Sequence, residues 1–290
     1  MKKTITLSAN AKINLYLRVT GRRDDGYHEI ESIMQAVTLA DTVTVTVDRG
    51  VSDRHVTLTC SDSAIPCDGR NIAVKCAERF FDAFGIDNCA AEIHIEKRIP
   101  VAGGLAGGST DGAAVLRALN ELCGTNADTS ALCEIGANVG ADIPFCVLGG
   151  TAVCTGIGEV LAPVSVPSPE YSVLIVAPGG GVSTPEAYRA IDNAGDIPQK
   201  CTAASVLAAL KEGLAPKVMH NDFEAVILPL SENAARVKEE LLSLGAYSAM
   251  MSGSGPTLFG LFTDPSLCEK AAEHLKSLGF TAHICSPASV

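Results

Sequence analysis

The stretch Pro100–Thr110 reads PVAGGLAGGST and contains four glycines, at positions 103, 104, 107 and 108. Two adjacent hydroxyl residues end it, and the apolar run AAVLRALN follows from Ala113. Because glycine has no Cβ, successive backbone N–H groups can converge on one anion. A helix that begins at or soon after Ser109 would add the positive end of its dipole there. The stretch therefore predicts a site for a nucleotide phosphate, and a glycine-rich turn that binds nothing is the alternative.

Two familiar phosphate-binding motifs do not fit this stretch. No lysine follows its last glycine, so it is not a P-loop. Its glycines also lack the spacing G-x-G-x-x-G, so a Rossmann dinucleotide site is not indicated. The stretch therefore predicts a phosphate loop of a third type.

The local context of the stretch is that of a phosphate loop. Apolar and polar residues alternate over residues 92–99, which predicts a strand before it. Residues 111–122 have the apolar content of a helix after it. Further strands are predicted at 4–17, 42–47 and 56–59, and a helix at 71–84. The first half of the chain is therefore rich in strands, and the glycine stretch joins a strand to a helix.

A proline-rich segment, APVSVPSP at 162–169, predicts the boundary between two domains, 1–162 and 163–290. Beyond it, strands are predicted at 171–177, 257–262 and 281–285, and helices at 202–211, 232–244 and 266–278. This order favours a small α+β sandwich with helices on one face of an antiparallel sheet.

Composition narrows the class of protein. The 290 residues carry a net charge of −11, which disfavours nucleic acid and anionic membranes as partners. The 11 cysteines form no C-x-x-C pair, which is typical of reduced, buried thiols and leaves no zinc set at ligand spacing. No apolar run reaches the length of about 18 residues that a membrane span needs. We therefore expect a cytoplasmic protein with no membrane partner and no metal-ligating side-chain cluster.

Lys12 is the first candidate for a catalytic residue. It lies in an apolar strand, where alternation places Asn10, Lys12 and Asn14 on one face. Such a face could supply a cation and amide groups beside a phosphate loop. The alternative is the solvated face of an edge strand.

Asp142 is the second candidate, in the segment GADIPF. A carboxylate here could accept the proton of a substrate hydroxyl during phosphoryl transfer. The alternative is structural, because an aspartate in a tight turn is usually a helix cap or part of an Asx-turn.

Two further segments could contribute to a site. Gly26–His28, after two arginines, offers an aromatic ring and an imidazole, which suit stacking on a flat heterocycle. An ordinary hairpin loop is the alternative. Met251–Gly255, MSGSG, is a second glycine-rich loop that comes just before a strand. Together with Pro100–Thr110, it suggests two loops that close on one site.

Three of these segments together resemble the GHMP kinases, the superfamily of galactokinase, homoserine kinase and mevalonate kinase. They are AKINLYL from Ala11, PVAGGLAGGST from Pro100 and MSGSGPTLFG from Met251, in the order of that superfamily. Within it, AKINLYLRVTGRRDDGYHEIESI and GADIPF, with PGGGVSTPEAY from Pro178, are similar to the family of 4-diphosphocytidyl-2-C-methyl-D-erythritol kinases.

The resemblance implies a fold and an activity. The fold would be α+β, with an N-terminal ATP-binding domain like domain 2 of ribosomal protein S5 and a C-terminal ferredoxin-like α+β sandwich. The activity would be ATP-dependent phosphorylation of the 2-hydroxyl of 4-diphosphocytidyl-2-C-methyl-D-erythritol, in the non-mevalonate route to isoprenoids. The cofactors would be ATP and Mg²⁺, and the partner would be this small-molecule substrate. The oligomeric state, monomer or weak dimer, is left open.

The resemblance also implies roles for single residues. Asp142 would take the proton from the 2-hydroxyl, and Lys12 would orient and polarise the reacting groups. Tyr27 and His28 would recognise the cytosine with Tyr188 as a second stacking ring, and Asn14 and Thr184 would line the substrate pocket. The ATP phosphates would be wrapped by Pro100, Val101, Ala102, Gly103, Gly104, Leu105, Ala106, Gly107, Gly108, Ser109 and Thr110. Ser109 or Thr110 would lie near Mg²⁺.

Three residues depart from the pattern of the family. Asn10 stands where a proline is common, Ala106 where a glycine is often found, and Ser252 where a threonine is usual. None of these changes removes a functional group. The alternatives are another GHMP kinase, such as a homoserine or mevalonate kinase, and a nucleotide-binding sensor or scaffold without catalysis. An RNA-binding protein of similar topology is disfavoured by the negative charge.

Overall fold

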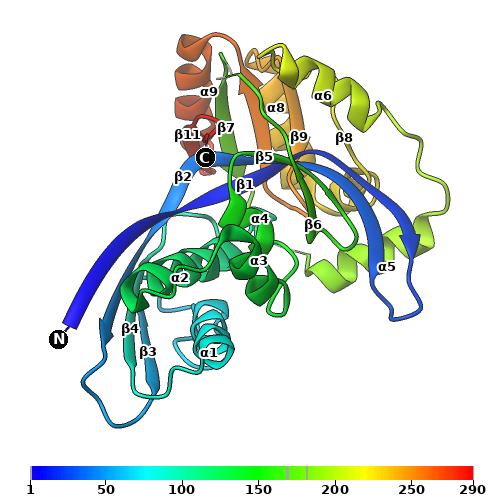
Figure 1. Cartoon of the computed structure of the whole chain (residues 1–290). Coiled ribbons are helices and arrows are strands. Elements are labelled where there is room, and N and C mark those ends of the chain that lie inside the picture. The colour runs from blue at the N-terminus through cyan, green and yellow to red at the C-terminus, as the bar shows by residue number, and fades with distance from the viewer. Residues whose placement is uncertain (1, 168–169, 181, 290) are drawn as a thin grey trace. The chain divides into compact units, whose positions relative to one another are not determined.

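The computed structural model describes residues 2–167, 170–180 and 182–289 (Figure 1). Internal contacts divide the chain into two compact units. Unit 1 comprises Met1–Ala11, Ala40–Ile99 and Ala106–Gly149, and unit 2 comprises Lys12–Leu39, Pro100–Leu105 and Gly150–Val290. The division of the sequence into 1–162 and 163–290 stays a prediction. Residues 168 and 169 of the proline-rich segment, and residue 181 of the segment from Pro178, lie outside the described residues.

Two long strands, β1 (Lys2–Arg22) and β2 (His28–Asp48), contribute to both units. Both are longer than the predicted strands. In the second half of β2, Val43, Val45 and Val47 are buried and alternate with threonines, as the TVTVTV pattern predicts. The first half of β2 contains consecutive buried residues on both faces, so it lacks the alternation that identifies a half-buried strand.

In unit 1, a sheet lies against four helices. Strand β4 (Ala90–Glu96) pairs antiparallel with β2 and parallel with β3 (His55–Cys60). The helices are α1 (Ile72–Phe84), α2 (Gly107–Cys123), α3 (Thr129–Ala137) and α4 (Ile143–Leu148). Their apolar side chains share one core with the sheet, in which Phe80, Phe81 and Leu116 are fully buried.

Helix α1 confirms the prediction for residues 71–84. The side chain of Asn71 accepts a hydrogen bond from the N–H of Ala73 at 2.9 Å and begins the helix. Gly85 ends it with a left-handed φ of 60°. The sequence prediction started the helix at 71 because the apolar residues at helical spacing begin directly after this capping residue.

Helix α2 begins four residues before the predicted start at 111. Its first two residues are Gly107 and Gly108, where little space is left for a side chain. A Cβ on Gly107 would lie 3.2 Å from Cγ2 of Ile99, and one on Gly108 would lie 3.2 Å from Cδ1 of Ile72. Glycine has a low helix propensity, so the sequence pattern did not predict that this first turn is helical. Close packing against Ile99 and Ile72 therefore favours glycine at these two positions.

In unit 2, β1 is a central strand. It pairs with β2 on one side and, in parallel, with the short β8 (His220–Asn221) on the other. On the far side of β2, β5 (Thr151–Thr155) pairs with β2 and with β6 (Val160–Pro163). The sequence analysis predicted neither β5 nor β6.

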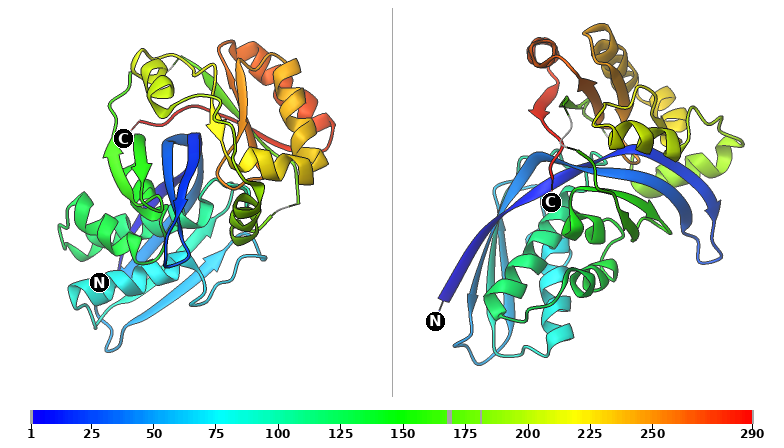
Figure 2. Two further views of the ribbon diagram at one scale, coloured as in Figure 1. Left: turned by 90° about the vertical axis from the view of Figure 1, so that its right-hand side faces the viewer. Right: turned by 45° about the horizontal axis from the view of Figure 1, so that its top comes forward.

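A second sheet of unit 2 has four antiparallel strands in the order β11-β7-β10-β9. They are β7 (Ser172–Ala177), β9 (Ser248–Met251), β10 (Leu258–Phe262) and β11 (Thr281–Cys285). Helices α8 (Glu232–Ser243) and α9 (Pro265–Ser277) pack together on one face of this sheet (Figure 2). This layer of helices on an antiparallel sheet confirms the predicted α+β sandwich.

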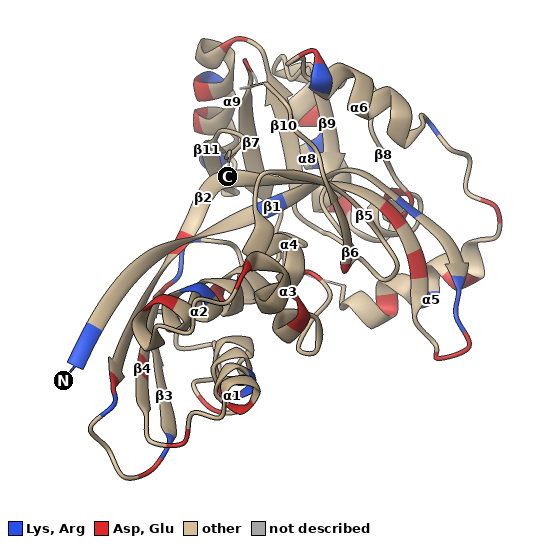
Figure 3. Ribbon diagram, viewed as in Figure 1, with Lys and Arg blue, Asp and Glu red and all other residues tan. Residues whose placement is uncertain are grey.

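The other helical segments of unit 2 are α5 (Thr184–Ala194), α6 (Ala203–Lys211), α7 (Phe223–Ile227) and the 3₁₀ turn η1 (Leu228–Leu230). Acidic and basic residues are interspersed along both units (Figure 3). In the part of the chain that the structure describes, no helix is both long enough and apolar enough to span a membrane.

Candidate active site

Lys12 is a buried cation in the central strand of unit 2. Lys12 is only 4% exposed, and its Nζ donates a hydrogen bond to Oδ1 of Asn14 at 2.7 Å. Among the described residues, no carboxylate lies within 4 Å of Nζ. The alternative of a solvated strand face is wrong, because Lys12 and Asn14 are both buried. A buried ammonium without a counter-ion is costly, so its position favours an anionic ligand.

Asn14 is held in one orientation by a chain of hydrogen bonds. Its Nδ2 donates to Oγ of Ser32 at 2.8 Å, and this hydroxyl donates to the carbonyl of Tyr16 at 2.7 Å. Oδ1 of Asn14 must therefore face Lys12. The amide of Asn14 therefore fixes the position of the Lys12 ammonium without neutralising its charge.

The first half of the glycine stretch lies against the late glycine loop within unit 2. Oγ of Ser252 donates to the carbonyl of Gly104 at 3.0 Å. A Cβ on Gly104 would lie only 2.1 Å from the carbonyl oxygen of Ser252. The N–H of Lys12 donates to the carbonyl of Leu105 at 3.1 Å. These contacts confirm that the two glycine loops lie together, and they place Lys12 beside both.

Three alternate residues of the stretch have a left-handed backbone. Their φ angles are 54° at Ala102, 76° at Gly104 and 59° at Ala106. Left-handed φ costs an L-residue with a Cβ roughly 1–2 kcal/mol. The two alanines therefore carry backbone strain in the stretch that is predicted to hold the phosphates.

We expect Ala106→Gly to raise the free energy of unfolding by about 0.5–1 kcal/mol. Glycine relieves the strain at φ 59° and adds about 0.5–1 kcal/mol of unfolded-state entropy, so the relief is larger than the cost. Urea unfolding followed by circular dichroism measures the change. Ala114→Gly, inside the same helix, is the control and should destabilise the protein. A loss of stability in Ala106→Gly would contradict the inference that the backbone of Ala106 is strained.

The N-terminus of α2 has free backbone donors. Ala106 occupies the N-cap position and offers no side-chain hydrogen bond. Within the described residues, the N–H groups of Gly107, Gly108 and Ser109 have no acceptor. This uncapped start of a 17-residue helix is suited to bind a phosphate.

The two hydroxyls at this helix start differ. Oγ1 of Thr110 donates to the carbonyl of Asn10 at 2.7 Å and ties the helix to β1 within unit 1. The hydroxyl of Ser109 has no partner among the described residues. Of the two residues predicted near a metal ion, Ser109 is therefore the one with an uncommitted hydroxyl.

Asp142 precedes the short helix α4 in unit 1 and is partly buried. It occupies the N-cap position, yet its side chain makes no capping hydrogen bond. In the described part of the chain, its carboxylate has no hydrogen-bond or ion-pair partner. The alternative of a structural cap is therefore wrong, and both carboxylate oxygens are available to a ligand.

The predicted base-recognition residues all belong to unit 2. His28 is 8% exposed and stacks on Tyr188, with ring centroids 4.6 Å apart and an interplanar angle of 18°. Phe223 contacts the ring of Tyr188 edge to face at 5.0 Å. Tyr27 is 60% exposed in the turn between β1 and β2. Tyr27 therefore presents an open ring, whereas His28 covers one face of Tyr188.

Thr184, predicted to line the substrate pocket, begins helix α5. Its hydroxyl lies 3.1 Å from that of Ser254, and the two hydrogen-bond. A capping box of Ser183 and Glu186 fixes this helix start. Thr184 is therefore connected to the late glycine loop, to which Ser254 belongs.

Sequence reasoning missed a buried charged cluster beside the glycine stretch. In unit 1, Nζ of Lys97 donates to Asp41 at 2.5 Å and to Asp111 at 2.8 Å. Oδ1 of Asp41 also accepts the N–H of Ile99 at 2.9 Å. Burial raises the pKa of Asp111 to about 7. The cluster joins the end of β4 to the first turns of α2, and its three residues are too far apart in the sequence for a local pattern to reveal it.

Asn221 was also missed, although the polar run HNDFE from His220 contains it. Its Nδ2 donates to the carbonyls of Met251 at 2.7 Å and Gly253 at 2.9 Å. The carboxylate of Glu224 accepts the N–H of Met251 at 3.0 Å. These two side chains hold the backbone of the late glycine loop.

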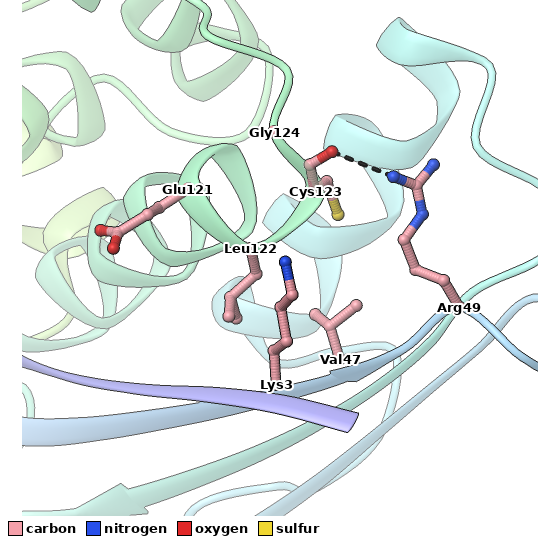
Figure 4. A pocket seen from close by; sticks show the side chains of 7 residues that line it. All are labelled: Lys3, Val47, Arg49, Glu121, Leu122, Cys123 and Gly124. Carbon is pink, nitrogen blue, oxygen red and sulfur yellow. Dashed lines mark hydrogen bonds between the residues drawn. The ribbon is translucent and has the colours of Figure 1, made fainter. Parts of the chain in front are cut away.

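A surface pocket of about 260 Å³ lies at the far end of α2 in unit 1 (Figure 4). Lys3, Arg49 and Cys123 are among its lining residues, and Nη1 of Arg49 donates to the carbonyl of Cys123 at 3.0 Å. This bond satisfies a carbonyl at the negative end of the helix dipole. The pocket contains none of the predicted site residues. The described residues also include no group of three or more His, Cys, Asp or Glu side chains able to hold a metal ion.

Comparison with protein families identifies both halves of the chain. The profile of the GHMP kinases N terminal domain matches residues 71–150, and that of GHMP kinases C terminal matches residues 203–280. A 4-diphosphocytidyl-2-C-methyl-D-erythritol kinase of Gloeobacter violaceus is 44% identical over 92% of this chain and 88% of its own. The kinase of the same name from Clostridium tetani is 39% identical over 93% of this chain and 95% of its own.

Solved structures agree with the sequence relatives. A crystal structure of 4-(cytidine 5'-diphospho)-2C-methyl-D-erythritol kinase has a TM-score of 0.81 and 33% identity, and covers 98% of this chain and 100% of its own. Homoserine kinase from Cytophaga hutchinsonii has a TM-score of 0.71 at 20% identity, over 99% of this chain and 96% of its own, which shows the shared fold alone. The predicted fold is confirmed, and the chain belongs to the GHMP kinases, in the family of 4-diphosphocytidyl-2-C-methyl-D-erythritol kinases.

Proposed function

We infer that this chain is an ATP-dependent kinase. It phosphorylates the 2-hydroxyl of 4-diphosphocytidyl-2-C-methyl-D-erythritol, in the non-mevalonate route to isoprenoid precursors. The acceptor is supported by relatives that carry the name of this kinase and match more than nine-tenths of the chain. The observation that carries the reaction class is Lys12, a buried cation without a counter-ion beside two glycine loops.

Asp142 is the proposed general base. Its carboxylate is uncommitted, so it can accept the proton of the substrate hydroxyl as the new bond to phosphorus forms. Lys12 is the proposed electrostatic partner, because an ammonium held by Asn14 is preorganised to stabilise negative charge on the reacting oxygens. Phosphoryl transfer needs little covalent chemistry from the protein, so positioning and charge stabilisation are sufficient.

Pro100–Thr110 is the proposed binding site of the ATP phosphates. Free N–H groups at the start of α2 and the helix dipole would bind phosphate oxygens without the lysine of a P-loop. Mg²⁺ fits this site through the hydroxyl of Ser109, because this ion keeps most of its contacts to phosphates and water. When bound, Mg²⁺ would neutralise charge on the transferred phosphoryl group.

The cytosine is proposed to contact Tyr27 and His28, with Tyr188 behind the imidazole. Asn14 and Thr184 are proposed to contact the rest of the acceptor. The net charge of −11 supports a small-molecule partner over a nucleic acid. The free cysteines support a reducing cytoplasmic location. The oligomeric state is proposed to be a monomer or a weak dimer.

A panel of acceptors tests the proposed function. Consumption of ATP is measured with the purified chain and Mg²⁺ in the presence of 4-diphosphocytidyl-2-C-methyl-D-erythritol, homoserine or mevalonate. We expect turnover with the cytidyl compound alone, because Tyr27 and His28 have no base to recognise in the others. Equal or better turnover of homoserine or mevalonate would assign a different GHMP kinase. ATP binding without turnover of any acceptor would indicate a nucleotide sensor.

A further inference from the structure

Two side chains of α5 hold the imidazole of His28 from different directions. Tyr188 stacks on the ring, and Asp192, one helical turn later, meets its edge, with 2.6 Å between Oδ1 and Nε2. Residues four positions apart lie on the same face of a helix, so both contacts come from one surface of α5. The ring can therefore neither tilt nor turn over without losing one of them.

The carboxylate determines which ring nitrogen carries a proton. The hydrogen bond from His28 is the main cause that lowers the pKa of Asp192, and this carboxylate is therefore ionised. An ionised carboxylate has no proton to donate, so Nε2 of His28 must carry the hydrogen. The second oxygen of Asp192 lies 3.3 Å from Nη1 of Arg22, which leaves the bond to His28 in place.

The other ring nitrogen, Nδ1, is open to a ligand. No described residue hydrogen-bonds to it, and it is not among the unpartnered polar atoms that are sealed from solvent. In a neutral imidazole with the proton on Nε2, Nδ1 is an acceptor. It matches an amino group, such as the 4-amino group of cytosine. Uracil presents a carbonyl oxygen at that position, so two acceptors would face each other.

We propose that Asp192 is a positioning residue that determines the choice of base: it fixes the Nε2-protonated tautomer of His28, so that Nδ1 accepts a hydrogen bond from cytosine and rejects uracil. This inference rests on the proposed function, in which His28 recognises the base. Asp192 itself contacts no substrate. Its effect is on the ratio of kcat/KM for the cytidyl and uridyl forms of the acceptor.

The first test compares the wild type with Asp192→Leu, which keeps the size of the side chain and removes the acceptor. We expect the ratio of kcat/KM for the cytidyl and uridyl acceptors to fall by about 10-fold or more. Without Asp192, Nδ1 of His28 is no longer fixed as an acceptor, so it no longer opposes the carbonyl oxygen of uracil. The change should be in KM for the acceptor, with kcat and the KM for ATP retained. Arg22→Gln is the matched control, because it removes the other partner of Asp192, and should keep the ratio.

A second readout needs no activity. Nitrogen-15 spectra of the histidine rings, with His28 assigned by comparison with His28→Phe, should show the proton on Nε2 in the wild type and a mixture of tautomers in Asp192→Leu. Asp192→Ala, which favours the helix, serves as a second variant if Asp192→Leu does not fold. A wild-type proton on Nδ1, whether alone or together with one on Nε2, makes that nitrogen a donor and overturns the proposal. An unchanged ratio in both variants overturns it as well.

Different experimental results would contradict this proposal and the proposed function. Equal kcat/KM for the cytidyl and uridyl acceptors would overturn the role of Asp192 and leave the kinase assignment intact. Absence of turnover with both would overturn the proposed function. In that case the tautomer of His28, read from the spectra, would still decide whether Asp192 positions the ring.

Discussion

We expect Asp142→Asn to lower kcat by about 10²–10⁴-fold, the range that a general base contributes, and to leave the dissociation constant of ATP nearly unchanged. Asparagine keeps the shape of the side chain and removes the ability to accept a proton. Because the carboxylate makes no capping bond to α4, the substitution should also leave the free energy of unfolding unchanged. Steady-state kinetics and nucleotide titration calorimetry measure the two effects.

Asp128→Asn is the matched control for this variant. Asp128 does cap its helix, since its side chain accepts the N–H of Ala131 at 2.8 Å, and asparagine is an equally good cap. We therefore expect wild-type kinetics from it. A kcat in Asp142→Asn within a few-fold of the wild type would remove Asp142 from the role of base.

We expect Lys12→Met to lower kcat by at least about 10²-fold and to change the free energy of unfolding by no more than about 1 kcal/mol. Methionine removes the charge that is proposed to stabilise the reacting oxygens. The protein no longer has to bury an unpaired ammonium, which offsets the loss of the donor to Asn14.

A second buried lysine provides the contrast. Lys97 is paired with Asp41 and Asp111, so Lys97→Met leaves two buried carboxylates without their cation. Breaking a buried pair in this way costs about 3–5 kcal/mol. Urea unfolding of the two variants should therefore separate them clearly. A large loss of stability in Lys12→Met would identify Lys12 as a structural residue instead of a catalytic one.

Secondary structure can be predicted from this sequence where one local signal dominates. The helix at 71–84 has a capping asparagine and apolar residues at helical spacing, and the structure reproduces it within one residue. The strand at 281–285 matches β11 residue for residue. The four glycines in eleven residues marked the stretch Pro100–Thr110 by composition, and its strand-and-helix context pointed to a phosphate loop; its binding of phosphates stays a prediction.

The remaining features depend on contacts that local patterns do not contain. The sequence could not show that β1 is a central strand, because β8, which pairs with Tyr16 and Leu17, is two residues long and lies some 200 positions later. The cluster of Lys97 with two aspartates is likewise assembled from three separate segments. Helix α4 was interpreted as a turn, since six residues are too few to show helical periodicity.

The shared strands β1 and β2 have a consequence for the order of folding during synthesis. All segments of unit 1 have been made once residue 149 has left the ribosome. Unit 2 pairs Tyr16 with His220, and the amide of Gln35 donates to the carbonyl of Ala288 at 3.3 Å, two residues before the end of the sequence. Chains are released N-terminus first, at roughly 5–20 residues per second. Half of each long strand can therefore be in its final place while its other half waits until the partner residues near position 288 have been made.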